Sequence, residues 1–149
     1  MSGREHATGE ADLAWCHEAV QGVSRTFALT VDVLEEPMAS QICVGYLLCR
    51  VADTVEDAGH IPPDAQSDVL RTYQRAIDPD DETDIGAFRE AVDEWLPAER
   101  DDDWTVVAEA PTIAATFEEL DPEAQEAIVP PVLEMVDGMA MFVDRHATE

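Results

Sequence analysis

Apolar residues recur at intervals of three and four along most of the chain, which is the spacing of an α-helix with one buried face. No stretch of useful length shows the two-residue alternation of a half-buried strand. The predicted helices cover, approximately, residues 13–23, 26–36, 38–58, 63–77, 88–95, 104–120 and 122–146. We therefore expect an all-α fold.

Proline and glycine mark several of the predicted helix boundaries. Pro37 ends the second helix because its ring cannot continue a helix interior, and Gly59 is expected to stop the third. Residues 78–84 are rich in turn formers and predict an exposed loop. Pro130 and Pro131 fall inside the last predicted helix, so we expect that helix to be kinked or split.

The length and composition are typical of one folded domain. The chain has 149 residues, of which 46% are apolar, and we expect a single helical domain over residues 1–149 with residues 1–9 disordered. Three cysteines, an odd number within predicted helices, favour a cytoplasmic location over a disulfide framework. We find neither a signal peptide nor a long apolar run, so any membrane contact is expected to be peripheral.

Acidic residues dominate the charge of the chain. It has 34 acidic residues against 8 basic ones, all arginine, and a net charge of −26 at pH 7. This excludes nucleic acid as an expected partner because the phosphate backbone would be repelled. We interpret the charge as the solvated acidic shell of a protein from a halophile, and expect poor folding at low ionic strength.

The most informative segment is residues 46–57, where an almost wholly apolar run is followed by Asp53, Glu56 and Asp57. In a helix these carboxylates share one face. Their mutual repulsion disfavours a packing role and suits oxygen ligands of a hard cation such as Mg²⁺, through which a diphosphate could bind. Other acidic triplets have the same spacing without this apolar context, and we assign them no chemistry; they include Asp32/Glu35/Glu36, Asp78/Asp81/Glu82 and Glu99/Asp102/Asp103.

Three sequence motifs together resemble the N-terminal half of a squalene/phytoene synthase. They are SRTFA at residues 24–28, ICVGYLLCR at residues 42–50 and DTVED at residues 53–57. The acidic pentad is similar to the first aspartate-rich motif of that family. A fourth segment, MVDGMAMF at residues 135–142, resembles the family's pocket-lining helix more loosely. The resemblance as a whole spans roughly residues 15–146.

The resemblance implies a fold and a set of site residues. The fold is an antiparallel helical bundle of the isoprenoid synthase type around a prenyl pocket. Asp53, Glu56 and Asp57 would bind Mg²⁺ and act in catalysis together with Tyr46. The residues implied in substrate binding are Ser24, Arg25, Phe27, Arg50 and Met139.

Most of these residues also have ordinary structural interpretations. Arg50 could form an ion pair with Asp53, three residues further on, although a guanidinium also suits a bidentate grip on phosphate oxygens. Arg25 could be a surface arginine, and Phe27 and Met139 could belong to the core. His60 follows the acidic pentad closely, but the expected helix break at Gly59 argues against it as a metal ligand.

The implied reaction joins two prenyl diphosphates head to head. The form of the acidic pentad favours conversion of farnesyl diphosphate to squalene through presqualene diphosphate, with NADPH as reductant. The alternative is a phytoene synthase, which uses geranylgeranyl diphosphate. In either case metal ions and arginines would stabilise the diphosphate leaving group.

The family pattern includes a second aspartate-rich motif, which this chain lacks. The predicted bundle is therefore incomplete, and two interpretations stay open. The chain could be a fragment that needs a complementary C-terminal chain, or a truncated, non-catalytic helical module that binds a partner. The fragment interpretation predicts apolar surface left uncovered where further helices would pack.

Overall fold

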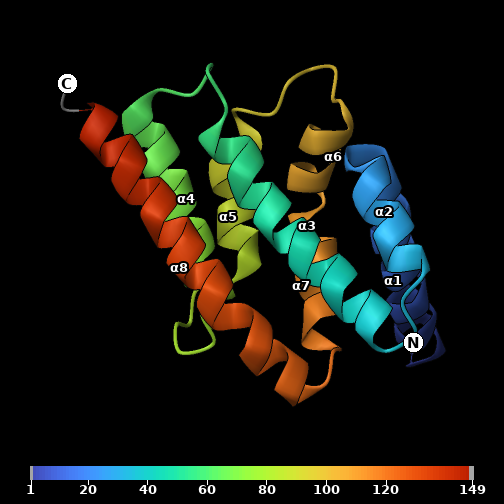
Figure 1. Ribbon diagram of the computed structural model, residues 1–149. Coiled ribbons are helices and arrows are strands. Elements are labelled where there is room, and N and C mark those ends of the chain that lie inside the picture. Colours follow the sequence, from blue (N-terminus) through green and yellow to red (C-terminus); the bar gives the residue numbers. More distant parts are fainter. Residues whose placement is uncertain (1, 148–149) are drawn as a thin grey trace.

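The computed structural model describes the backbone of residues 2–147 and the side chains of residues 12–145. The described residues form helices and no strand, which confirms the all-α prediction (Figure 1). The helices are α1 (Ser2–Val23), α2 (Arg25–Asp32), α3 (Met38–Glu56), α4 (Pro63–Ile77), α5 (Ile85–Asp93), α6 (Asp102–Ala108), α7 (Ala110–Glu118) and α8 (Pro122–Ala147). Within the described part of the chain, no helix is long and apolar enough to cross a membrane.

Helix α3 is the central element of the fold. It contacts α1, α2, α4, α6, α7 and α8, and its apolar run supplies Leu47, Val51 and Val55, which are fully buried or nearly so. Burying such a side chain contributes about 1.5–3 kcal/mol. Other helices surround α3 on most of its faces. This explains why its sequence is apolar on most faces.

Helices α4 and α8 lie side by side and run in opposite directions (Figure 1). Arg71 of α4 forms an ion pair with Asp137 of α8, with 2.6 Å between Nη1 and Oδ1. The buried Tyr73 hydroxyl of α4 donates a hydrogen bond of 2.6 Å to the carbonyl oxygen of Leu48. This pair of contacts fixes α4 against both α8 and α3.

The prediction of one helix over residues 104–120 is wrong in one respect. The structure has two helices there, α6 and α7. The break is at Glu109, whose backbone lies at φ −97° and ψ 18°. Pro111 follows in the first turn of α7. Since proline has no backbone N–H, the hydrogen bond that would continue the first helix through this point is lost.

Helix α8 continues through Pro130 and Pro131 as one element, so the prolines do not split it, and a kink there stays a prediction. Both prolines are exposed, as are Glu126 and Ala127 one turn earlier. Water can therefore bind the carbonyl groups that the prolines leave without an N–H partner. At the other end of the chain, α1 begins at Ser2; the side chains of residues 1–9 lie outside the described residues, and disorder there stays a prediction.

Candidate functional site

A small polar cavity lies at the C-terminal end of α3. It has a volume of about 240 Å³. Its walls come from the end of α3, the loop that follows it and the start of α6. The lining residues are Arg50, Asp53, Thr54, Asp57, Ala58, Gly59, His60, Asp101, Asp103 and Trp104.

The three carboxylates of the acidic pentad occupy the last turn of α3 and its cap. Asp53 and Glu56 are half-buried, whereas Asp57 is exposed as the C-cap residue. The pKa of Glu56 is raised above its ordinary value of 4.5, first by burial and then by the charges of Asp57 and Asp53. The three groups are thus close enough to repel one another, although only Asp53 and Asp57 line the cavity.

The position of these carboxylates on the helix is electrostatically unfavourable. The C-terminal end of a helix carries partial negative charge, which basic side chains normally offset. The last turn of α3 contains no basic residue. A bound cation would relieve both this helix-end repulsion and the repulsion among the carboxylates.

Arg50 is held by a carboxylate from another helix. Its Nε and Nη2 donate hydrogen bonds to Oδ1 and Oδ2 of Asp103, at 2.9 and 3.0 Å. A longer ion pair of 3.8 Å joins Nη1 of Arg50 to Asp53. Burial alone would lower the pKa of Arg50, but the hydrogen bonds and charge of Asp103, with smaller effects of Tyr46 and Asp53, raise it.

The loop and the start of α6 hold the remaining wall of the cavity in place. Asp101 caps α6 by accepting a hydrogen bond of 2.9 Å from the backbone N–H of Trp104. Nε2 of His60 is hydrogen-bonded to the carbonyl oxygen of Trp95 at 2.7 Å. His60 therefore lies in the cavity wall, but one ring nitrogen is already engaged.

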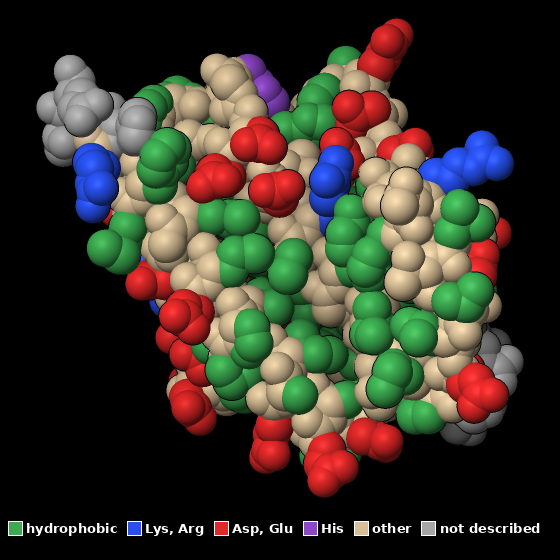
Figure 2. Space-filling view, viewed as in Figure 1, with side chains coloured by type: hydrophobic (Ala, Val, Ile, Leu, Met, Phe, Trp, Pro, Cys, Tyr) green, Lys and Arg blue, Asp and Glu red, His purple; other side chains and the backbone are tan. Residues whose placement is uncertain are grey.

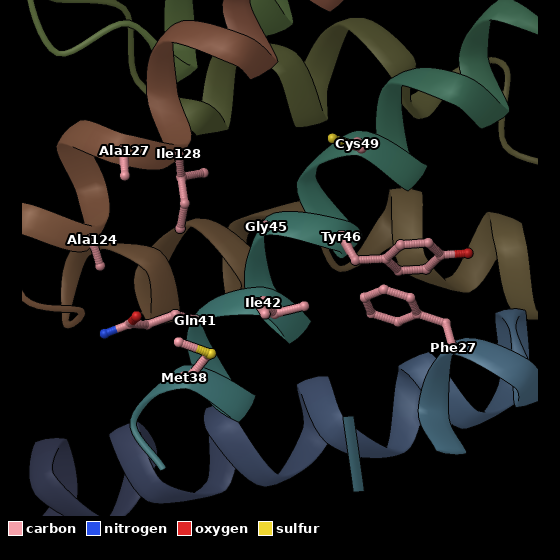
Figure 3. Close-up of a pocket in the computed structure, with 10 residues that line it drawn as sticks. All are labelled: Phe27, Met38, Gln41, Ile42, Gly45, Tyr46, Cys49, Ala124, Ala127 and Ile128. Atoms are coloured by element: carbon pink, nitrogen blue, oxygen red, sulfur yellow. The ribbon is translucent and has the colours of Figure 1, made fainter. Parts of the chain in front are cut away.

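A larger apolar groove lies beside this cavity, between α3, α2 and the start of α8. It has a volume of about 470 Å³. Figure 3 shows its two long walls: side chains of α3 on one side and three residues of α8 on the other. The lining residues are Phe27, Met38, Gln41, Ile42, Gly45, Tyr46, Cys49, Ala124, Ala127 and Ile128.

Two stacked rings form the part of the groove lining that lies between α3 and α2. The ring centroids of Phe27 and Tyr46 are 4.1 Å apart, with an angle of 17° between the planes (Figure 3). Phe27 is placed by the start of α2, where its backbone N–H donates to the Ser24 side chain at 3.2 Å. Ser24 therefore caps α2 in this structure. The cap holds Phe27 in position against Tyr46.

The apolar groove and the acidic cavity lie on one face of α3. Ile42, Gly45, Cys49 and Asp53 follow one another at three- and four-residue steps, which places them along a single stripe. The pKa of the Cys49 thiol is raised by burial and then by the charge of Asp53. Figure 2 shows acidic side chains, with a basic one beside them, above a hydrophobic area that extends between α3 and α8.

The carboxylates do not by themselves complete a metal site. Among the described residues, no group of three or more His, Cys, Asp or Glu side chains is placed to hold a metal ion. The donor type nevertheless fits Mg²⁺, which is usually bound by one or two carboxylates, several waters and phosphate oxygens. Four carboxylates line the cavity. Asp101 caps α6 and Asp103 binds Arg50, which leaves Asp53 and Asp57 as the candidate ligands.

Two other residues singled out from the sequence lie away from the groove lining. Arg25 is exposed as the first residue of α2. Met139 is half-buried against the core and does not line the groove, whose α8 wall is formed nearer the start of that helix. Sequence reasoning missed Asp103, because its acidic triplet resembled background, and Ile128, because an isolated isoleucine in an apolar helix carries no distinctive signal.

Large apolar side chains from α2 to the first part of α3 are in contact with water, and two of them, Met38 and Ile42, line the groove. Exposed fractions are 62% for Leu29, 80% for Val33, 54% for Met38 and 38% for Ile42. These four residues belong to α2, the loop after it and α3. An apolar surface of this kind is consistent with the expected uncovered face.

Comparison with known proteins gives consistent matches over most of the chain. The squalene/phytoene synthase family profile matches residues 20–149. A squalene synthase from Eremothecium gossypii is 32% identical over 135 residues, which is 91% of this chain and 28% of that protein. Human squalene synthase is 28% identical over 138 residues, which is 93% of this chain and 30% of the relative.

Solved structures show the same likeness. A complex of TcSQS with the ligand E5700 superimposes with a TM-score of 0.70 at 24% identity, over 89% of this chain and 35% of that one. A second TcSQS complex, with BPH1237, gives a TM-score of 0.66 at 26% identity and covers 36% of that chain. The chain thus spans about a third of these structures, and less than a third of the two curated relatives above.

Proposed function

This chain belongs to the squalene/phytoene synthase family, and from that premise we propose that it supplies the part of a head-to-head prenyl synthase that binds the donor diphosphate and its metal. The favoured reaction is the condensation of two farnesyl diphosphates to squalene through presqualene diphosphate, with NADPH as reductant. Phytoene formation from geranylgeranyl diphosphate is the second candidate. The family match across the intact acidic pentad favours both over a non-catalytic helical module.

The observation that carries the proposal is the single stripe on α3. It begins as one wall of an apolar groove and ends at Asp53 and Asp57 in a polar cavity. A prenyl diphosphate has the same division into an apolar tail and an anionic head. The groove would take the tail and exclude water from it, while the cavity would take the head.

Asp53 and Asp57, with Glu56 beside them, would hold Mg²⁺. When bound, the metal supplies Lewis-acid stabilisation of the negative charge that develops on the leaving diphosphate. Arg50 lies at the same cavity and offers guanidinium donors to phosphate oxygens. Arg25, at the exposed start of α2, is proposed as a second substrate contact.

Tyr46 and Phe27 would act where the groove approaches the cavity. Tyr46 is close enough to Arg50 to raise the pKa of the guanidinium. Of the two stacked rings, Tyr46 is therefore the one that we assign to the charged region. We propose that Tyr46 acts in catalysis near the diphosphate, and that Phe27 lines the prenyl tail. Met139 is proposed only as a more distant wall of the substrate site.

The complete reaction is proposed for this chain together with a complementary C-terminal chain. The matched relatives are much longer, since this chain covers 28–30% of them. Helix docking on this chain is supported by four exposed apolar side chains, Leu29, Val33, Met38 and Ile42, of which the last two line the groove. Any membrane contact is proposed to be peripheral.

The test is product formation from farnesyl diphosphate, Mg²⁺ and NADPH in molar KCl. We expect squalene only when a complementary C-terminal chain is added, and loss of product when Mg²⁺ is removed. Activity of these 149 residues alone would contradict the need for a second chain. Phytoene from geranylgeranyl diphosphate, without squalene from the shorter donor, would select the second candidate.

A further inference from the structure

We infer that Asp103 is a positioning residue, which holds the Arg50 guanidinium away from the metal-binding carboxylate Asp53. This inference rests on the proposed function of the acidic cavity. Asp103 lies on α6, 53 residues after Arg50 in the chain, and both line the cavity. Its role is defined by competition between two carboxylates for one arginine.

The geometry shows which carboxylate wins this competition. Asp103 receives two parallel hydrogen bonds from Arg50, at 2.9 and 3.0 Å, whereas Asp53 is 3.8 Å from the nearest guanidinium nitrogen. A bidentate pair of this kind is stronger and more directional than a single ion pair. Side-chain exposure is 28% for Arg50 and 34% for Asp103, so solvent screens the pair only in part.

Asp53 is nevertheless always within reach of Arg50. The two residues are three positions apart on α3, where side chains are neighbours on the helix surface. If Asp103 lost its charge, the guanidinium would turn to Asp53. That carboxylate would then be partly neutralised and sterically covered, and its affinity for a divalent cation would fall.

Asp103 can act in this way because α6 packs against both α3 and α1. The helix is capped by Asp101. The neighbouring Asp102 faces α1, because its carboxyl carbon lies 2.9 Å from the position that a Cβ atom on Gly22 would occupy. Asp102 does not line the cavity. Asp102 therefore provides a matched control, with the same charge one residue away and a different neighbour.

The first experiment observes the arginine directly, without metal. In the folded chain, the Nε–H signal of Arg50 in a ¹H–¹⁵N NMR spectrum should be protected from solvent exchange, and Arg50→Gln would assign it. Asp103→Asn should shift this signal and accelerate its exchange, while Asp103→Glu should restore part of the protection. Asp102→Asn should leave the signal unchanged.

The second experiment measures Mn²⁺ binding by electron paramagnetic resonance of the free ion. Asp103→Asn should weaken binding about tenfold, which is typical of losing a charged hydrogen-bond partner, and by more than Asp102→Asn. In an Arg50→Gln background the excess effect of Asp103→Asn should disappear. This non-additivity separates positioning of Arg50 from a general loss of negative charge.

The outcomes distinguish this inference from the proposed function. Equal effects of Asp103→Asn and Asp102→Asn, or an undiminished effect in the Arg50→Gln background, would overturn the role of Asp103 while leaving the metal site intact. Mn²⁺ binding that is insensitive to Asp53→Asn would overturn the proposed metal site, and with it the function that Asp103 serves. An unprotected Arg50 signal in the unsubstituted chain would overturn the pairing itself.

Discussion

Phe27 stacks on Tyr46 with 4.1 Å between ring centroids, which joins the short helix α2 to the central helix α3 in the lining of the groove. Stacked aromatic pairs contribute about 0.5–1.5 kcal/mol beyond the area they bury. The same contact therefore stabilises the fold and shapes the surface proposed for the prenyl tail.

Replacing Phe27 by alanine should lower the free energy of unfolding by about 1–3 kcal/mol, because stacking and buried contact area are both lost. We also expect weaker binding of farnesyl diphosphate in calorimetry. Tyr46→Phe is the control, since it keeps both rings but removes the hydroxyl. Equal stability of the Phe27→Ala variant and the unsubstituted chain would show that the stack has no structural role.

Replacing Asp53 by asparagine should reduce Mg²⁺-dependent turnover of the complete enzyme by orders of magnitude, because a metal ligand loses its charge. Helix content, measured by circular dichroism, should change little, since Asp53 is half-exposed. Asp68→Asn on the exposed side of α4 provides a matched charge control. A parallel loss of helix content in Asp53→Asn would instead assign a structural role.

The raised pKa of Glu56 predicts a pH-dependent stability. Burial and the charges of Asp57 and Asp53 favour the protonated form in the folded state. Its stabilising contribution is complete below the ordinary value of 4.5 and is lost as pH rises through the higher folded-state pKa. Above that range the charged group destabilises the metal-free fold.

Glu56→Gln should therefore stabilise the metal-free protein at pH 7 by less than about 1 kcal/mol, a small effect because solvent screens the group. The gain should vanish below pH 4.5, the ordinary pKa. Thermal unfolding across this pH range measures it, with the exposed Glu134→Gln as control. A stability gain that is independent of pH would show that repulsion among the carboxylates is not its cause.

The buried Tyr73 hydroxyl predicts sensitivity to alkaline conditions. Burial, and then the nearby Cys49, raise the pKa of Tyr73 well above its ordinary value of 10.0. Its contribution to stability is complete below pH 10.0 and is lost as pH rises through the higher folded-state value. Tyr73→Phe should cost about 0.5–1.5 kcal/mol at neutral pH, because the hydrogen bond from its hydroxyl to the Leu48 carbonyl is lost.

The same substitution should reduce the dependence of stability on pH above 10, which urea unfolding at several pH values would measure. An unchanged alkaline transition in Tyr73→Phe would assign that transition to another group.

The net charge of −26 predicts a salt requirement for folding. At low ionic strength the Debye length exceeds the distance between neighbouring surface charges, so repulsion acts across the whole molecule. Circular dichroism should show helix content that rises between millimolar and molar KCl. Identical spectra at both salt concentrations would contradict this interpretation of the acidic surface.

Much of the fold follows from local sequence patterns. The period of apolar residues predicts the helical class, and the family resemblance drawn from residues 24–28, 42–50 and 53–57 is confirmed by the family match. Local signals also have limits: Pro111 accompanies a break between α6 and α7, whereas the proline pair of α8 does not split that helix. The two cases differ in burial: Val107, one turn before Pro111, is buried, whereas Glu126 and Ala127, one turn before the proline pair, are exposed.

The candidate site was less predictable where its parts are distant in sequence. The acidic end of α3 stood out because of the apolar run before it. Asp103 did not, since only the packing of α6 on α3 brings it to Arg50. Similarly, the second groove wall comes from Ala124 and Ile128, while the sequence favoured Met139 further along α8.

The proline pair in α8 separates two stretches of that helix with different neighbours. Ala124, Ala127 and Ile128 before it wall the groove, whereas Asp137 after it is anchored to α4. Without two N–H groups at the junction, bending there breaks fewer hydrogen bonds than elsewhere in the helix. We therefore expect the stretch that walls the groove to shift against α3 at a lower energetic cost than the stretch that Arg71 anchors.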